Sequence, residues 1–562
     1  MTSNKWHYYC EPQPEIGEMS SPVTHSSPEN HYDRGSDHEL RSNLNGQQIS
    51  SLKSYHERDS AANFTDNDIG FSSVSSDGKD SEIDLDTACP LFSSESNYGS
   101  DSDTEKGLES IVHGLKRIKR DYNISMRAIG AVAALFRAHG HDIPKDARTI
   151  LGTPRAPVDD KSFIHLGLLE GLLQVISTTP VNSLSLDLKI NIDGLPLSKS
   201  SSVNFWPILC LISKAKPHPP FVISLYCGRG KPPDLESYLC HFINEYISIK
   251  DNGFTSNGNN YSIKLKSAIC DAPARSFLKC TKGHNGKGGC ERCSQRGEST
   301  NRRWVYPEFD ALRTDLTFRS GEHEDHRTGL SPFEAIDELD MNFDFPLDPM
   351  HMLYLGVMKR MLKNIWLGKK FPHRFSDQQI KTVNVDLLSL RSFWPVEFNR
   401  KGRILQNVPN WKAVEFRDFL LYLGPLVLKK VRSDEKLEHF LHFHVAARIL
   451  ATPSSNNDQK SFAGSLLRYF VFDFGRIYGQ DQVVYNVHSL MQLADDCIRN
   501  GSNLESDSCF PFKNRLGQLK RLIRTSDSTN YIAQLRNRIV EMNKICGSIQ
   551  TEKKLEIWNL SM

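Results

Sequence analysis

The sequence predicts an α/β protein whose strand-rich core is interrupted by a large, mainly helical insertion and preceded by a disordered N-terminal arm. Three observations lead to this plan. Residues 179–280 contain short segments in which polar and apolar residues alternate, as in half-buried strands. Residues 281–500 carry long runs of apolar residues at helical spacing. Residues 1–105 show neither period.

The arm, residues 1–105, is rich in Ser, Asn, Asp and Glu. Residues 1–106 hold about 20 acidic and about 7 basic side chains, whereas the rest of the chain holds about 62 basic and about 47 acidic ones. The net charge of +2 therefore conceals an acidic arm and a basic body. So polar a segment cannot bury enough apolar surface to offset the entropy cost of ordering, and we expect it to be disordered.

The basic body favours a nucleic-acid partner. No run of about 18 apolar residues occurs, so no membrane span is expected. The 12 cysteines are spread along the chain without the dense spacing of a secreted disulfide framework, and no signal-peptide pattern is present. These features predict an intracellular, reducing location, which for a nucleic-acid-binding protein of a eukaryote is the nucleus.

Residues 106–178 are predicted to form a small, basic helical domain. Ile111, Leu115 and Ile118 fall at helical spacing, and Lys116 and Arg117 lie between them. The charged face could contact DNA phosphates or simply face solvent, and the sequence leaves both interpretations open.

Residues 179–280 form the first part of the predicted core. The segments 185–192, 221–226 and 261–266 are typical of strands, and 235–247 is typical of a helix. Asp193 directly follows the first strand, and Asp271 follows the third. Acidic residues at the ends of neighbouring strands can hold the pair of Mg²⁺ or Mn²⁺ ions that phosphoryl transfer requires. An aspartate before a glycine, as at Asp193, is more often a plain turn residue.

The insertion, residues 281–500, combines a Cys-x-x-Cys pair with helices. The helical runs are Met352–Leu367, Trp411–Val431, His439–Leu450, Leu466–Tyr478 and Val487–Ile498. Residues 501–562 are predicted to be a basic, helical, C-terminal part of the core. There Lys513, Arg515, Lys520, Arg521 and Arg524 lie among apolar residues at helical spacing, which predicts a cationic helix face for DNA phosphates or, alternatively, a solvated face.

Several strings occur in the order found in a known family. They are Ile192–Ser200, Phe205–Ile208, Ile269–Leu278, Lys282–Gly286, Cys290–Cys293, Leu347–Gly356 and Tyr485–Leu490. Together they resemble animal transposase-domain proteins related to the CACTA-type DDE/D transposases, over roughly residues 108–545. The resemblance implies an RNase H-like catalytic core split by a helical insertion, DNA as the partner, and a homo-oligomer. It also implies two-metal cleavage of a DNA strand followed by transfer of the freed 3′-hydroxyl.

On this resemblance Asp193 is the first metal ligand and Asp271 the second. The third acid is expected within Phe510–Leu522, where relatives have a glutamate and this chain has Lys513. An ammonium group has no lone pair for a metal, so it cannot replace a carboxylate. Glu541 is kept as a distant substitute. The sequence therefore supports two functions: a DNA-cutting transposase, or a degenerate or domesticated DNA-binding regulatory scaffold.

A structural zinc ion is the second expected metal. Cys290 and Cys293 form half of a zinc knuckle, and a tetrahedral site needs two further ligands. Cys280 and His284 lie nearby in the sequence, whereas the resemblance favours His439 and His444, with His442 as an alternative. The other interpretation of Cys290 and Cys293 is a free thiol pair in a reducing cell.

Asp348 and His351 belong to a segment that opens a predicted helix. Asp348 followed by Pro349 suits an N-cap and first-turn pair. By resemblance the segment is instead an active-site or insertion-anchoring element that includes His351. Both interpretations remain open at this stage.

Overall fold

The computed structural model describes residues 110–122, 124–153, 162–197, 203–213, 215, 218–323, 325–369, 371–398, 400–431, 435–523 and 531–543. The predicted arm, residues 1–105, lies outside the described residues, as does Arg524. Among the residues that are described, no helix is both long and apolar enough to cross a membrane.

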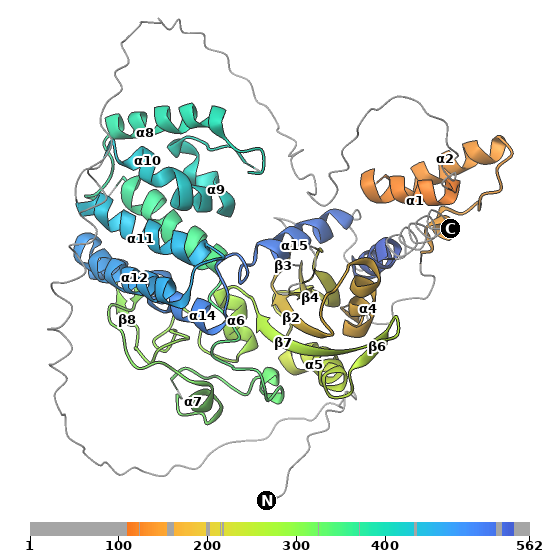
Figure 1. Cartoon of the computed structure of the whole chain (residues 1–562), viewed down its shortest axis with the longest axis horizontal. Helices are drawn as coiled ribbons and strands as arrows, with labels where there is room; N and C mark the ends of the chain where they lie inside the picture. Colours follow the sequence, from red (N-terminus) through yellow and green to blue (C-terminus); the bar gives the residue numbers. More distant parts are fainter. Residues whose placement is uncertain are drawn as a thin grey trace, which may run out of the picture. The chain divides into compact units, whose positions relative to one another are not determined.

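A mixed sheet of seven strands forms the α/β part (Figure 1). Its strands are β1 (Phe163–His165), β2 (Ser185–Ile192), β3 (Leu195–Pro196), β4 (Val203–Ile212), β5 (Phe221–Arg229), β6 (Phe254–Ser256) and β7 (Asn259–Ala268). They run in the order β1-β5-β4-β2-β7-β6, and β3 pairs with β4. All pairs are antiparallel except β2 with β7, which is parallel. The three strands expected from alternation are confirmed as β2, β5 and β7.

Helix α5 (Leu235–Asn252) makes the crossover that the parallel pair requires. Asp234 caps its first turn by accepting from the N–H groups of Glu236 and Ser237. Helix α4 (Leu168–Thr178) packs with α5 in one core that also includes the alternate side chains Leu186, Leu188 and Ile190 of β2. Burial of these apolar side chains is what holds the helices to the sheet.

A second core contains helix α15 (Phe510–Leu522) and the helix over residues 531–543. Phe512, Leu516 and Leu519 of α15 belong to it together with Phe205 and Leu209 of β4. Residues more than 200 positions apart in the chain are thus brought into one packed layer. This arrangement carries α15 to the part of the sheet where β2 ends.

The region between the sheet and α15 is mainly helical and has its own apolar core. Its helices are η4 (Met350–Met358), η5 (Arg360–Trp366), α8 (Asp377–Ser389), η6 (Leu390–Phe393), η7 (Leu405–Asn410), α9 (Ala413–Asp418), η8 (Phe419–Leu423), α10 (Gly424–Leu428), α11 (Glu435–Ala451), α12 (Asn457–Tyr478), η9 (Gln480–Gln482), α13 (Tyr485–His488), η10 (Ser489–Gln492) and α14 (Leu493–Arg499). Helices α8 to α12 gather in one block in Figure 1. The mainly helical character predicted for this region is therefore confirmed.

Individual helices differ from the predicted runs. The run predicted over 411–431 is divided among α9, η8 and α10, because a π-helical segment interrupts it and Pro425 opens α10. Helix α12 begins earlier than expected, where Asn456 caps it by accepting from the Gln459 N–H. Apolar periodicity located these helices, and capping and π-turns determined where they end.

Two further groups of helices and strands lie outside these cores, one before β1 and one after β7. Residues before β1 form α1 (Ile111–Tyr122), α2 (Met126–Ala138) and α3 (Ala147–Leu151), which share a small core of their own. The chain after β7 forms α6 (Ala272–Leu278), the hairpin of β8 (Glu298–Thr300) and β9 (Arg303–Val305), α7 (Asp315–Arg319) and η3 (Pro332–Ala335). The Cys-x-x-Cys loop lies between α6 and this hairpin.

Candidate functional site

Two aspartates follow the adjacent parallel strands β2 and β7. Asp193 comes directly after Ile192, the last residue of β2. Asp271 comes three residues after the end of β7 and caps α6, its Oδ1 accepting from the Ala274 N–H at 2.8 Å. Because the carboxyl ends of parallel neighbours lie at the same edge of a sheet, the two carboxylates face a common site. The negative charge of Asp271 contributes to raising the pKa of Asp193, so the two carboxylates interact.

The turn after Asp193 is closely packed. A Cβ placed on Gly194 would lie 2.8 Å from Cζ2 of Trp206, so a larger residue would push the indole ring away. Packing against Trp206 therefore explains why glycine follows Asp193, in addition to the preference of glycine for turns. The side chain of Asp193 is 7% exposed.

Lys513 occupies the site between the strand ends. It lies in the first turn of α15, and its Nζ forms an ion pair with Oδ2 of Asp193. Burial raises the pKa of Asp193, and Lys513 opposes that rise. Burial alone would lower the pKa of Lys513, but the charges of Asp193 and Asp271 outweigh it and the pKa is raised. Lys513 is therefore an ammonium ion that neutralises a buried carboxylate.

A second lysine, Lys231, lies beside Asp271. It follows β5, and its Nζ donates to the carbonyl oxygen of Pro273 at 3.0 Å. The Nζ also lies 4.8 Å from the centroid of the Phe277 ring. Partial burial lowers the pKa of Lys231, and the charge of Asp271 opposes this. No motif in the sequence indicated Lys231, and β5, the strand that it follows, is separated from β2 by β4.

Asp348 connects η4 to α15. Its buried carboxylate accepts from the backbone N–H groups of Met350, His351 and Cys509, the last at 2.9 Å. It also bonds Nδ1 of His351. Burial alone would raise the pKa of Asp348, but these bonds outweigh it and the pKa is lowered. The residue is thus both the expected helix start and an anchor that holds the beginning of α15, four residues before Lys513.

His351 lies near Asp193 as well. Its side chain is 25% exposed, and its charge acts on Asp193. The carboxylate of Asp348 fixes the imidazole through Nδ1. The helix-start and the anchoring interpretations of this segment both agree with the structure, and His351 adds an imidazole near Asp193.

Glu541, the proposed substitute acid, is engaged elsewhere. Its carboxylate accepts from the hydroxyl of Thr153 and forms an ion pair with Arg538. It therefore joins the 531–543 helix to the segment after α3. The structure does not bring Glu541 to Asp193, whose strongest charged neighbours are Lys513, Asp271 and His351.

The cationic face expected on α15 is smaller than predicted. Lys520 and Arg521 are exposed, and Lys520 donates to the carbonyl oxygen of Pro196 at 2.7 Å. Arg515 is buried and donates to Gln518, because the helix turns that position toward the sheet. Lys513 points to the aspartates. The expected face thus keeps two exposed cations among the residues described on α15.

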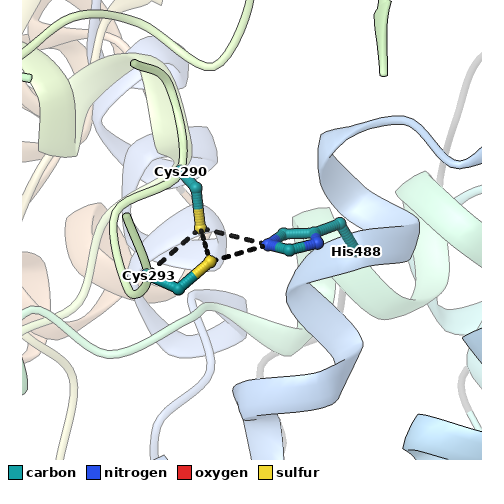
Figure 2. A group of neighbouring side chains, drawn as sticks. All are labelled: Cys290, Cys293 and His488. Carbon is teal, nitrogen blue, oxygen red and sulfur yellow. Dashed lines mark hydrogen bonds between the residues drawn. The ribbon is translucent and has the colours of Figure 1, made fainter. Parts of the chain in front are cut away.

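The Cys-x-x-Cys loop gathers with His488, from the end of α13 (Figure 2). The Nε2 of His488 lies 3.3 Å from the Sγ atoms of both Cys290 and Cys293, and the two sulfur atoms are 3.4 Å apart. All three side chains are buried. Two thiolates bound to one zinc ion, with Zn–S bonds of ~2.3 Å, have sulfur atoms about 3.8 Å apart. The three atoms here are only slightly closer together than that.

The electrostatics of the two thiols favour one thiolate. Burial alone would raise the pKa of Cys290, but hydrogen bonds from the Cys293 thiol and from backbone N–H groups lower it to about 7. The hydrogen bond to Cys290, followed by burial, raises the pKa of Cys293. Arg313 donates to the carbonyl oxygens of both cysteines and so fixes the loop. The donor set of two sulfur atoms and one imidazole nitrogen fits zinc.

Gln492 lies next to this group, beside His488. It follows His488 by one helical turn, is buried, and its Nε2 lies 3.4 Å from Nε2 of His488. Its Oε1 is buried without a hydrogen-bond partner. An amide oxygen is a weaker ligand for zinc than an imidazole or a thiolate. Three good ligands therefore converge here, and Gln492 lies beside one of them, His488.

The structure corrects the histidines predicted to complete the zinc site. His439 stacks on the Phe470 ring, and its Nε2 lies 3.0 Å from the Phe470 carbonyl oxygen. The Nδ1 of His444 lies 2.7 Å from the Leu420 carbonyl oxygen. Both are packing residues of α11, and among the described residues neither joins Cys290 and Cys293. His488 lies in a segment that the sequence analysis recognised without assigning it a role.

All four residues of the loop bind the segment 485–496. Cys290 and Cys293 meet His488, Glu291 accepts from the hydroxyl of Tyr485 at 2.7 Å, and Arg292 forms an ion pair with Asp496 at 2.9 Å. These charged side chains are almost fully buried. The loop after α6 is thereby joined to the end of the helical insertion.

Comparison with known proteins adds no relative: no protein-family model matches the chain, and no curated protein matches it.

Proposed function

We propose that this chain is a transposase-like, nucleic-acid-binding protein with an RNase H-like core, in which Lys513 has replaced a metal ligand and blocked two-metal DNA cleavage. The ion pair between Lys513 and Asp193 carries this proposal. A residue whose ammonium group already neutralises the first aspartate excludes a divalent cation from the same carboxylate oxygen, by charge repulsion and by occupancy.

The sheet supports the RNase H-like part of the proposal. Its central strands lie in the order β5-β4-β2-β7. Strands β2, β4 and β5 follow one another in the chain as antiparallel neighbours, and β7 is parallel to β2. Strands of an RNase H-like core follow the same plan. The two aspartates follow β2 and β7, where that plan requires the metal ligands.

The cations around the aspartates support a nucleic-acid partner. Lys231, Lys513 and Lys520 lie near the ends of β5, β2 and β3, and a phosphate backbone is the general ligand for such a group. A nucleic-acid-binding role also implies action in the nucleus, and a transposase-like architecture implies a homo-oligomer.

The second part of the proposal is a structural zinc ion. Cys290, Cys293 and His488 would hold it, and bound zinc would fasten the loop after α6 to the segment 485–496. The buried ion pairs of the same loop support this fastening role.

The test is nicking of supercoiled plasmid DNA by the full chain in Mg²⁺ or Mn²⁺. We expect the unaltered chain to bind DNA without nicking it. Lys513→Glu restores a carboxylate, so we expect nicking there, and adding Asp271→Asn should abolish it. Lys513→Gln is the matched control, because it removes the ammonium group without supplying a charged ligand.

Two results would overturn the proposal. Nicking by the unaltered chain that Asp271→Asn abolishes would mean that Lys513 does not block the metals. Failure to bind DNA at low salt would remove the nucleic-acid role and favour the regulatory scaffold.

A further inference from the structure

Each of the two aspartates at the strand ends has its own lysine. Lys513 approaches Asp193 from α15, and Lys231 approaches Asp271 from the loop after β5. The two lysines come from segments separated by more than 280 positions in the sequence, so no single helix face or local charge run explains their meeting. Two ammonium groups thus stand beside the two carboxylates that would otherwise hold two divalent ions.

The lysines around the two aspartates outnumber them, and the third nearby carboxylate, Asp348, is already bonded to His351 and to three backbone N–H groups. Lys231, Lys513 and Lys520 supply three cations near two aspartates, and Lys520 is held over the turn after Asp193 by its bond to Pro196. Two bare aspartates repel a phosphodiester and need metal ions to accept it. With three ammonium groups beside them, that repulsion is removed without a metal.

The lysines also keep donors for a ligand. An ammonium group has three N–H donors. Lys231 directs one to the Pro273 carbonyl oxygen, and Lys513 directs one to Asp193. The side chain of Lys513 is 33% exposed, and Lys231 is exposed. Both can therefore reach a phosphate oxygen from the positions in which they are already held.

We propose that Lys231 and Lys513 bind a nucleic-acid phosphodiester directly at the Asp193–Asp271 site, in place of two divalent metal ions. This inference rests on the proposed nucleic-acid-binding function and specifies how that function survives the loss of the metal ligand. Binding at the site is electrostatic, independent of Mg²⁺, and indifferent to base sequence.

The test measures fluorescence anisotropy of labelled duplex DNA, single-stranded DNA and duplex RNA with the full chain, in EDTA and in Mg²⁺, over a range of NaCl concentrations. We expect binding in EDTA to be at least as tight as in Mg²⁺, because Mg²⁺ is not needed and competes with the lysines for phosphate. Lys231→Ala should weaken binding about tenfold and reduce the slope of log K against log [NaCl] by about one. The three nucleic acids show which source of phosphodiester is preferred.

Lys513 needs a variant that keeps the fold. Lys513→Ala alone leaves Asp193 buried without a partner, so Lys513→Ala is combined with Asp193→Asn and its folding is checked by thermal melting. The combination should also reduce the salt slope by about one. Lys381→Ala, an exposed lysine on α8, is the matched control and should leave affinity and slope unchanged.

Two outcomes would overturn the inference. Binding that disappears in EDTA, or that keeps its affinity and slope in both lysine variants, would show that metal ions or other surfaces hold the phosphates, while nucleic-acid binding itself would stand. No binding to any of the three nucleic acids would overturn the inference and the proposed function together.

Discussion

The Nζ of Lys513 forms an ion pair with Oδ2 of Asp193 across the end of strand β2. Lys513 is held there from two directions. The apolar side of α15 packs on β4, and Asp348 binds the backbone N–H of Cys509 at the start of the helix. The position of the ammonium group is therefore a property of the fold and not of a loose surface side chain.

Loss of Lys513 should destabilise the protein because it leaves a carboxylate that is 7% exposed without its counter-ion. We expect Lys513→Met to lower the free energy of unfolding by about 2 kcal/mol, less than for a fully buried pair since Lys513 itself is partly exposed. Urea denaturation measures this. Adding Asp193→Asn should recover most of the loss, and an equal loss in the double variant would contradict the pairing.

Zinc content should depend on His488 and not on His439. Cys290→Ser and His488→Ala should each lower zinc per chain, measured by elemental analysis, because each removes one of three good ligands. His439→Gln should keep the zinc. Gln492→His places an imidazole next to these ligands and should strengthen zinc retention against a chelator by about tenfold or more. Retention of zinc in His488→Ala would refute this ligand set.

Acid should weaken the helical insertion through His439. Burial lowers the pKa of His439 from 6.5 to about 4, although its bond to the Phe470 carbonyl and the charge of Asp473 oppose the shift. The unfolded chain therefore takes up the proton first, and stability is lost as the pH falls from above 6.5 toward 4. From pH 7.5 to pH 5 this residue alone should cost about 2 kcal/mol. Denaturant melts at both pH values should show a smaller loss in His439→Gln than in the unaltered chain.

Asp348→Asn should uncouple η4 from α15. The backbone N–H of His351 and the Nδ1 of its ring both contact Oδ2 of Asp348. The NH₂ group of an asparagine placed there would face the backbone donor instead of accepting from it. We expect a loss of about 2 kcal/mol in unfolding free energy. The control is Asp377→Asn, because Asp377 is 81% exposed and its ion pair with Arg374 should contribute almost nothing. Equal effects of the two changes would contradict an anchoring role for Asp348.

The sequence predicted three of the seven strands, and the position of the two aspartates after two of them, because these depend on local signals. Alternation in 185–192 identified β2, and the position of Asp193 directly after it followed. The pairing of β2 with β7 and the approach of Lys513 to Asp193 depend on packing between segments far apart in the chain. The resemblance, and not periodicity, led to Lys513.

The sequence could not locate the partners that meet through tertiary packing. The resemblance favoured His439 and His444 as a ligand pair, although they are five residues apart, and the structure uses both in packing against Phe470 and Leu420. His488 joins the cysteines because the segment 485–496 packs on the loop after α6, through contacts such as the Arg292–Asp496 ion pair. Lys231 was missed because a single lysine in a Gly- and Pro-rich loop carries no local signal.

The most direct test of the central claim is Mn²⁺ binding to the full chain by isothermal titration calorimetry, with the unaltered protein beside Lys513→Glu and Lys513→Glu combined with Asp271→Asn. We predict that the unaltered protein binds no Mn²⁺ at the Asp193–Asp271 site, that Lys513→Glu binds it, and that the added Asp271→Asn abolishes the binding. Binding of Mn²⁺ by the unaltered protein that Asp193→Asn removes would contradict the account, because the ammonium group of Lys513 would then not exclude the metal.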